Sequence, residues 1–191
     1  MLVNSDHLKS VTEQNIHIVR SLNSPERLMS AAEEAARSLS YHLAVLRGQR
    51  LSTEREVLAE LARELHFPER EEPNWNSVRD FIGDLGWLLS KDDAADPTRS
   101  QPARGVVVLL HDPGHLFRSN AVELAFLVDA LGSQSQHVVS RGIPFHVIIG
   151  PMPEDYRCEV FLNLLSVSSH FCDACQMVDG DCEANEGESV V

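Results

Sequence analysis

The stretch GVVVLL, residues 105–110, is a continuous apolar run, and IPFHVII, residues 143–149, is a second. Apolar runs without alternation mark strands that are buried on both faces, as strands of parallel sheets are. A third strand candidate is YHLAVL at 41–46. Helical patterns fill both connections, as crossovers between parallel strands require. The sequence therefore predicts an α/β fold with a three-stranded parallel sheet and packed helices.

The remaining residues divide into two extensions around a domain at 41–150. Residues 1–40 form an N-terminal extension, in which Ile16 and Ile18 permit a short extra strand and Ser24-Pro25 reads as the start of a helix over 25–39. Residues 151–191 combine a helical segment with an acidic tail that contains cysteines. Residues 153–191 carry nine acidic side chains and one basic side chain, so the tail holds much of the net charge of −13.

This composition argues against several functional classes. A chain with net charge −13 does not suit non-specific binding to nucleic acid, because phosphates are met with Lys and Arg. An acidic surface instead attracts basic protein partners. No apolar stretch reaches the length of a membrane span, no signal-peptide pattern is seen in the first 22 residues, and four Cys do not make a disulfide scaffold. We therefore expect a cytoplasmic location.

Two helices have clear sequence signals. Thr53 and Glu56 form a capping box for a helix that ends near Pro68. The segment 75–89 has the helical periodicity of an amphipathic helix. Its apolar face is Val78, Phe81, Ile82, Leu85 and Leu89, and its opposite stripe is Asn76, Arg79, Asp80, Asp84 and Trp87. Ser119 reads as the cap of a later helix, and 91–103 reads as a long polar loop.

A set of residues in and around this helix, with two later segments, follows a known family pattern. They are Phe67-Pro68-Glu69, Asn74-Trp75-Asn76, Asp80 and Asp84-Leu85-Gly86-Trp87, together with the 106–110 strand and Arg141-Gly142-Ile143-Pro144-Phe145. Through these residues the chain resembles the barstar family. The resemblance covers roughly 42–150. It implies a three-stranded parallel sheet with packed helices, and a protein that inhibits a ribonuclease by plugging its active site. The plugging loop and helix correspond to 68–80 here, with a carboxylate placed where substrate phosphate would lie.

Several positions depart from the family pattern. Arg70, Glu72, Asn76 and Arg79 stand where the family has Tyr, Gly, Asp and Trp, and His137 stands where it has Glu. The phosphate-mimicking Asp is retained as Asp80. The resemblance thus implies a partner-binding set of Arg70, Glu72, Asn74, Asn76, Arg79, Asp80, Asp84, Trp87 and His137. The expected partner is a basic ribonuclease or toxin, which would make the chain a bacterial immunity protein. The alternative is the same fold repurposed as an adaptor or regulatory interaction module.

Two tryptophans have open roles at this stage. Trp87 either is exposed as an interface anchor, since Trp is common among binding hot spots, or folds back under the 91–103 loop. Trp75 lies next to the helix cap, and we favour a packing role for it.

Catalytic and metal-binding patterns are weak. His111 and His115 follow a buried strand, where α/β active sites often form, but Pro113-Gly114 between them makes a tight turn and no nucleophile motif is present. His170, Cys172, Cys175 and Cys182 could ligate zinc, although only one CxxC is present. The sequence therefore predicts a protein that is not an enzyme and needs no cofactor.

Overall fold

The computed structural model describes residues 16–19, 25–68, 73–89, 102–150 and 175–178. Eleven elements follow one another along these residues. They are β1 (Ile16–Val19), α1 (Pro25–Leu39), β2 (His42–Arg47), a 3-10 turn (Gly48–Arg50), α2 (Glu54–Glu64), α3 (Trp75–Asp84), α4 (Gly86–Leu89), β3 (Val106–His111), α5 (Pro113–Ser140), β4 (Phe145–Gly150) and β5 (Cys175–Val178). The three predicted strands and the predicted capping box of Thr53 with Glu56 are confirmed.

The sheet is parallel throughout, in the order β2-β3-β4-β1-β5. The predicted number of strands, three, was too low, because the sheet continues past β4 with β1 and β5. Ile16 of β1 lies opposite Val147 of β4, so the extra strand permitted by the N-terminal sequence forms. Three strands alone would leave the backbone N–H and C=O groups of β4 unpaired along one edge, and β1 supplies their partners. Residues 16–19 of the N-terminal extension are therefore part of the same sheet.

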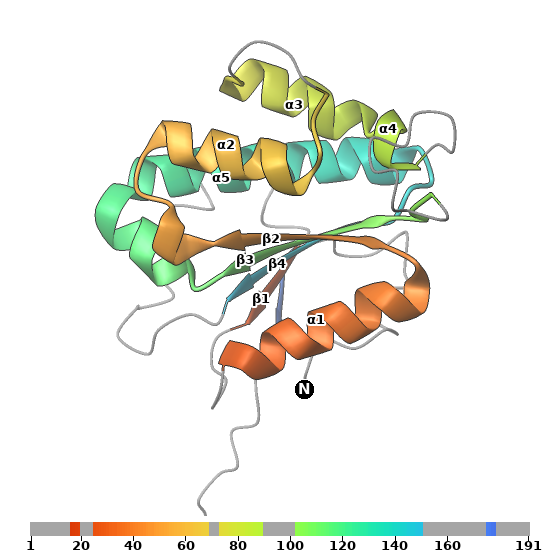
Figure 1. The fold of residues 1–191 in the computed structure, drawn as a ribbon, viewed down its shortest axis with the longest axis horizontal. Helices are drawn as coiled ribbons and strands as arrows, with labels where there is room; N and C mark the ends of the chain where they lie inside the picture. The colour runs from red at the N-terminus through yellow and green to blue at the C-terminus, as the bar shows by residue number, and fades with distance from the viewer. Residues whose placement is uncertain (1–15, 20–24, 69–72, 90–101, 151–174, 179–191) are drawn as a thin grey trace, which may run out of the picture.

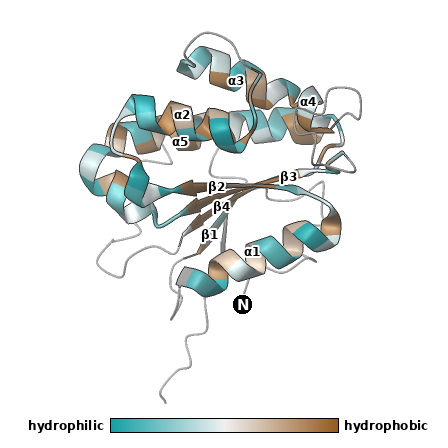
Figure 2. Cartoon of the chain, viewed as in Figure 1, coloured by the Kyte–Doolittle hydropathy of each residue, from teal (hydrophilic) through white to brown (hydrophobic). Residues whose placement is uncertain are grey.

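Helices cover both faces of the sheet, which explains the continuous apolar runs (Figures 1 and 2). Along β3, Val108 and Leu110 join the larger core under α2 and α5, while Val107 and Leu109 join a smaller core under α1. Successive strand residues point to opposite faces, so a strand that is covered twice needs apolar residues at every position. Helix α1 meets its face of the sheet through Leu28, Ala32 and Ala35.

Helix α3 lies over α2 and α5, on the side away from the sheet (Figure 1). The predicted single helix over 75–89 is interrupted at Leu85, which adopts a left-handed conformation with φ 51° and ends α3. The side chain of Leu85 is fully buried, and α4 follows as a single turn. Apolar periodicity alone did not reveal this break, because Leu85 fits the apolar face of a continuous helix.

Helix α5 begins earlier than the predicted cap at Ser119. It starts at Pro113 and has a kink at Asn120, whose backbone is not helical. The Asn120 side-chain oxygen accepts a hydrogen bond from the Glu123 N–H at 3.3 Å, so Asn120 caps the second part of the helix. The Ser119 hydroxyl instead bonds to the carbonyl of His115 within the first part. None of the helices in the described ranges is long and apolar enough to cross a membrane.

Gly105 lies just before β3, and its lack of a side chain lets Tyr41, which precedes β2, and Pro144, which precedes β4, come close to its backbone. A Cβ atom at this position would lie 2.7 Å from the Pro144 carbonyl oxygen and 3.0 Å from Cε1 of Tyr41. The space lets the Tyr41 ring lie 6.4 Å from the ring of His146 on β4, centroid to centroid. A side chain at Gly105 would displace backbone as well as the tyrosine.

We therefore expect Gly105→Ala to lower the free energy of unfolding by about 1–3 kcal/mol, the range of overpacking substitutions. Gly86→Ala is the matched control, because the nearest atom to its added Cβ is an Asp84 oxygen at an ordinary 3.4 Å. That control should leave stability unchanged within about 0.5 kcal/mol or raise it slightly. Chemical denaturation of both variants measures the difference, and equal effects would contradict the crowding argument.

Candidate functional site

The outer stripe of α3 is polar and exposed. Asn76, Asp80 and Asp84 are spaced four residues apart, so they lie along one side of the helix, and all three are exposed. Within the described part of the chain, neither carboxylate forms an ion pair. The structure therefore brings three of the predicted partner-binding residues together on one accessible face of the helix.

Asn74 sets the start of this helix. Its side-chain oxygen accepts hydrogen bonds from the N–H groups of Asn76 and Ser77, each at 3.0 Å. The Ser77 hydroxyl accepts in return from the Asn74 N–H at 2.9 Å. This reciprocal capping satisfies N–H groups that a helix start leaves open. Asn74, which the sequence placed in the partner-binding set, thus has a structural task that fixes where the exposed stripe begins.

The adjacent stripe of α3, one residue back along the helix, faces α5. Trp75 donates its indole N–H to the Glu123 carboxylate at 3.2 Å, and Arg79 pairs with Asp129 at 2.5 Å. Gly83 completes the stripe, because a Cβ there would lie 3.0 Å from the Gln134 side-chain oxygen. Positions 75, 79 and 83 thus meet α5 at successive turns, and positions 76, 80 and 84 remain outside.

The C-terminal end of α3 has a further anchor. Arg141, in the turn after α5, donates to the Gly83 carbonyl oxygen at 2.5 Å, with the Asp84 carbonyl at 3.5 Å. A cation at the C-terminus of a helix satisfies carbonyl groups and opposes the negative end of the helix dipole. His137 is exposed beside Gly83, with its Cδ2 atom 3.7 Å from the position of a Cβ at Gly83. His137 therefore lies at the edge of the α3 surface.

Trp87 corrects one prediction. The ring is buried, with 9% of the residue exposed, and its indole N–H donates to the Leu65 carbonyl oxygen at 3.0 Å. It packs edge-on against the rings of Phe67 and Phe81. The left-handed turn at Leu85 redirects the chain, so Trp87 leaves the polar stripe on which a continuous helix would have placed it. Trp87 is part of the core and not an exposed anchor.

Trp75 packs as expected and touches an unusual carboxylate. Burial raises the pKa of the Glu123 carboxyl above its ordinary value, and the charge of Glu54 raises it further. The hydrogen bond from Trp75 acts in the opposite direction. The charge of Glu54 on α2 thus acts on Glu123 of α5 beside the start of α3.

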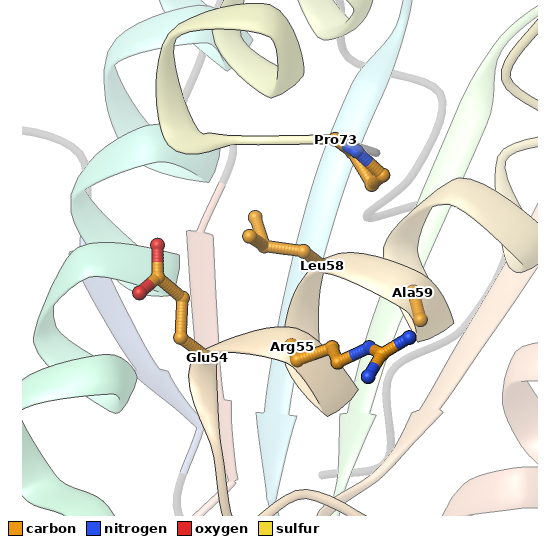
Figure 3. A pocket seen from close by; sticks show the side chains of 5 residues that line it. All are labelled: Glu54, Arg55, Leu58, Ala59 and Pro73. Atoms are coloured by element: carbon orange, nitrogen blue, oxygen red, sulfur yellow. The ribbon is translucent and has the colours of Figure 1, made fainter. Parts of the chain in front are cut away.

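A pocket of about 360 Å³ lies at the same end of α3 (Figure 3). Glu54, Arg55, Leu58 and Ala59 of α2 line it together with Pro73, which precedes the Asn74 cap. One wall is therefore charged, and Leu58 and Pro73 make an apolar part. The predicted partner-binding residues Arg70 and Glu72 lie outside the described residues.

Within the described residues, no arrangement of side chains supports the catalytic or the metal-binding alternative. Ser52 Oγ lies 3.4 Å from His115 Nε2, and the nearby Glu56 carboxylate is engaged by the N–H groups of Ser52 and Thr53. The described ranges contain no group of three His, Cys, Asp or Glu side chains able to hold a metal ion. His170, Cys172 and Cys182 lie outside these ranges, and for Cys175 only the backbone of β5 is described.

Three residues that position α3 were not predicted in that role: Glu123 and Asp129 were missed, and Arg141 was noted only as part of the family resemblance. Their partners are 48, 50 and 58 residues away along the chain. A local pattern cannot reveal such pairs. One signal was available at Glu123, an acidic residue within the otherwise apolar stretch 121–128, because acids are seldom buried without a partner.

Replacing Glu123 by Gln tests the electrostatics of this contact. The raised pKa means that the folded state holds a proton more tightly than the unfolded state, so wild-type stability falls as pH rises above about 4.3. Gln keeps an oxygen for Trp75 and carries no charge. The stability of Glu123→Gln relative to wild type should therefore increase between pH 4 and pH 7 in denaturation measurements. Glu33→Gln, at an exposed site on α1, is the control, and a pH-independent difference at Glu123 would refute the assignment.

A double-mutant cycle with Arg79→Met and Asp129→Asn tests the central anchor. Because the two side chains keep 32% and 37% of their exposure, we expect a coupling energy of roughly 0.5–1 kcal/mol, as for other partly exposed pairs. Amide hydrogen exchange within α3 should become faster in either single variant. The pair of Glu60 with Arg63 inside α2 is the control, since breaking it should not change exchange in α3. Zero coupling with unchanged exchange would show that this ion pair does not position the helix.

Comparison with known proteins bears on the identity of this fold and surface. Among curated proteins, none matches the chain. A chain in the structure of Drosophila ORC bound to poly(dA/dT) DNA and Cdc6 has a TM-score of 0.56 and 14% sequence identity, over 92% of this chain and 27% of that one. The present chain spans about a quarter of the length of that chain, and at this identity the likeness shows the fold alone. The family model Barstar (barnase inhibitor) matches residues 41–150, more than half of the sequence, so the chain belongs to the barstar family.

Proposed function

We propose that the chain inhibits a basic ribonuclease or ribonuclease toxin by covering its active site with α3 and the segment that leads into it. The observation that carries the proposal is the exposed stripe of Asn76, Asp80 and Asp84 on a helix that is anchored at three successive turns. Family membership supports a protein-binding role of the barnase-inhibitor kind.

The charge of this surface suits an enzyme that binds RNA. A ribonuclease active site presents cationic groups to phosphate, and a carboxylate can meet the same groups. Asp80 and Asp84 stand one helical turn apart with no internal ion pair among the described residues. Close charge pairs across an interface can couple by about 1.5–7 kcal/mol, and the net charge of −13 adds long-range attraction. The proposed setting is a bacterial cytoplasm in which the chain protects its producer.

The test compares two variants that remove the same charge. Asp80→Asn removes a carboxylate from the proposed contact, and Glu33→Gln removes one from α1, on the opposite side of the sheet (Figure 1). The native complex is purified from cells that make the chain, and the captured protein is assayed for cleavage of labelled RNA. We expect wild type and Glu33→Gln to inhibit cleavage, and Asp80→Asn to bind about tenfold or more weakly. A partner that does not cleave RNA and binds Asp80→Asn as tightly as wild type would overturn the proposal.

A second candidate is an adaptor or regulatory module built on the same fold. The observation that favours it is the pairing of Arg79 with Asp129, which occupies a position that the sequence assigned to partner contact. A changed surface of this kind suits a changed partner. The RNA-cleavage assay of the captured protein separates the two functions.

A further inference from the structure

Two large apolar side chains are exposed on one face of α5. Val122 is 62% exposed and Phe126 is 45% exposed, and within the described residues they are the large hydrophobic side chains that remain open to this degree. They are four residues apart, so they are neighbours on the helix surface. Single exposed apolar residues are ordinary, whereas clustered ones mark interaction sites.

Trp75 joins them from α3. Its ring stacks on Phe126 with centroids 6.0 Å apart and 28° between the ring planes. The hydrogen bond to Glu123 holds the indole in place. We call Trp75, Val122 and Phe126 the apolar ledge. Because its rings are already held, a partner that contacts the ledge loses little side-chain entropy in ordering it.

The apolar ledge is continuous with the proposed binding surface. Trp75 is followed directly by Asn76, the first residue of the exposed stripe, and the Arg79–Asp129 pair lies one turn beyond Phe126 on α5. Glu123 accepts the indole hydrogen bond and is itself largely buried, whereas Glu54, whose charge acts on Glu123, is exposed. An exposed acid beside an apolar centre, on a chain with net charge −13, complements an apolar group that has cationic neighbours.

We infer that the protein partner seats an aliphatic or aromatic side chain on the apolar ledge, and that Lys or Arg residues flank that side chain. The inference rests on the proposed function, because it extends the same α3 surface onto α5. It adds a second kind of contact to charge pairing. Apolar and aromatic groups at the centre of an interface carry much of its binding energy, while charges guide the approach.

Photo-crosslinking identifies what covers the ledge. Val122 is replaced by p-benzoylphenylalanine in the full chain, and the same residue at Glu33 on α1 serves as the control. After irradiation in producing cells, the crosslinked peptide is sequenced. A segment of another protein with an apolar residue beside Lys or Arg would support the inference. A second copy of this chain, another segment of the same chain, or no crosslink above the control would each overturn it.

Affinity measurements with the purified partner give the second test. Phe126→Leu keeps an apolar side chain and should bind within about threefold of wild type, whereas Phe126→Gln should bind about tenfold or more weakly. Melting temperatures of both variants establish that they are folded. Equal affinity of Phe126→Gln and wild type would overturn the inference. RNA cleavage by the partner and the effect of Asp80→Asn are separate readouts, so failure of the ribonuclease role is distinguishable from failure of the ledge.

Discussion

A parallel sheet has to be shielded from water on both faces, and this requirement organises the rest of the chain. Val107 and Leu109 face one side of the sheet, and Val108 and Leu110 face the other. Helices on one side only would therefore leave half of the apolar side chains of β3 exposed to solvent. The N-terminal extension meets this need, since α1 covers one face and β1 covers the open edge of β4. With that face occupied, α2 and α5 pack on the other and offer a platform on which α3 lies.

Packing on α2 and α5 fixes the position and rotation of α3, so that the same residues of this amphipathic helix always face outward. Helices of ten residues are marginal by themselves, so most of their stability comes from packing. Here Val78 and Ile82 enter the core, and the contacts of Trp75, Arg79 and Gly83 fix the rotation of the helix against α5. That rotation decides which residues face outward. A partner therefore meets Asn76, Asp80 and Asp84 in an arrangement that exists before binding, which lowers the entropic cost of association.

Much of this architecture could be predicted from local patterns, and the parts that could not depend on distant contacts. The continuous runs at 105–110 and 143–149 predicted buried parallel strands, and Thr53 with Glu56 predicted a helix start. The width of the sheet depended on whether β1 finds β4, a pairing across about 130 residues that no local signal reports. Within the site, exposure of Asp80 and Asp84 followed from helical periodicity. The burial of Trp87 did not, because a single left-handed residue, Leu85, changes the direction of everything after it.

The Arg79–Asp129 pair also determines the charge that α3 presents. An arginine on the outer stripe would oppose a basic partner and weaken the field of the two nearby carboxylates. By pairing with Asp129 at 2.5 Å, Arg79 is drawn toward α5 and its charge is balanced there. Asp80 and Asp84 then account for the charge of the exposed stripe, and Asn76 between the cap and Asp80 is neutral. Because Asp129 on α5 balances Arg79, the exposed stripe stays acidic although an arginine stands directly before Asp80 in the chain.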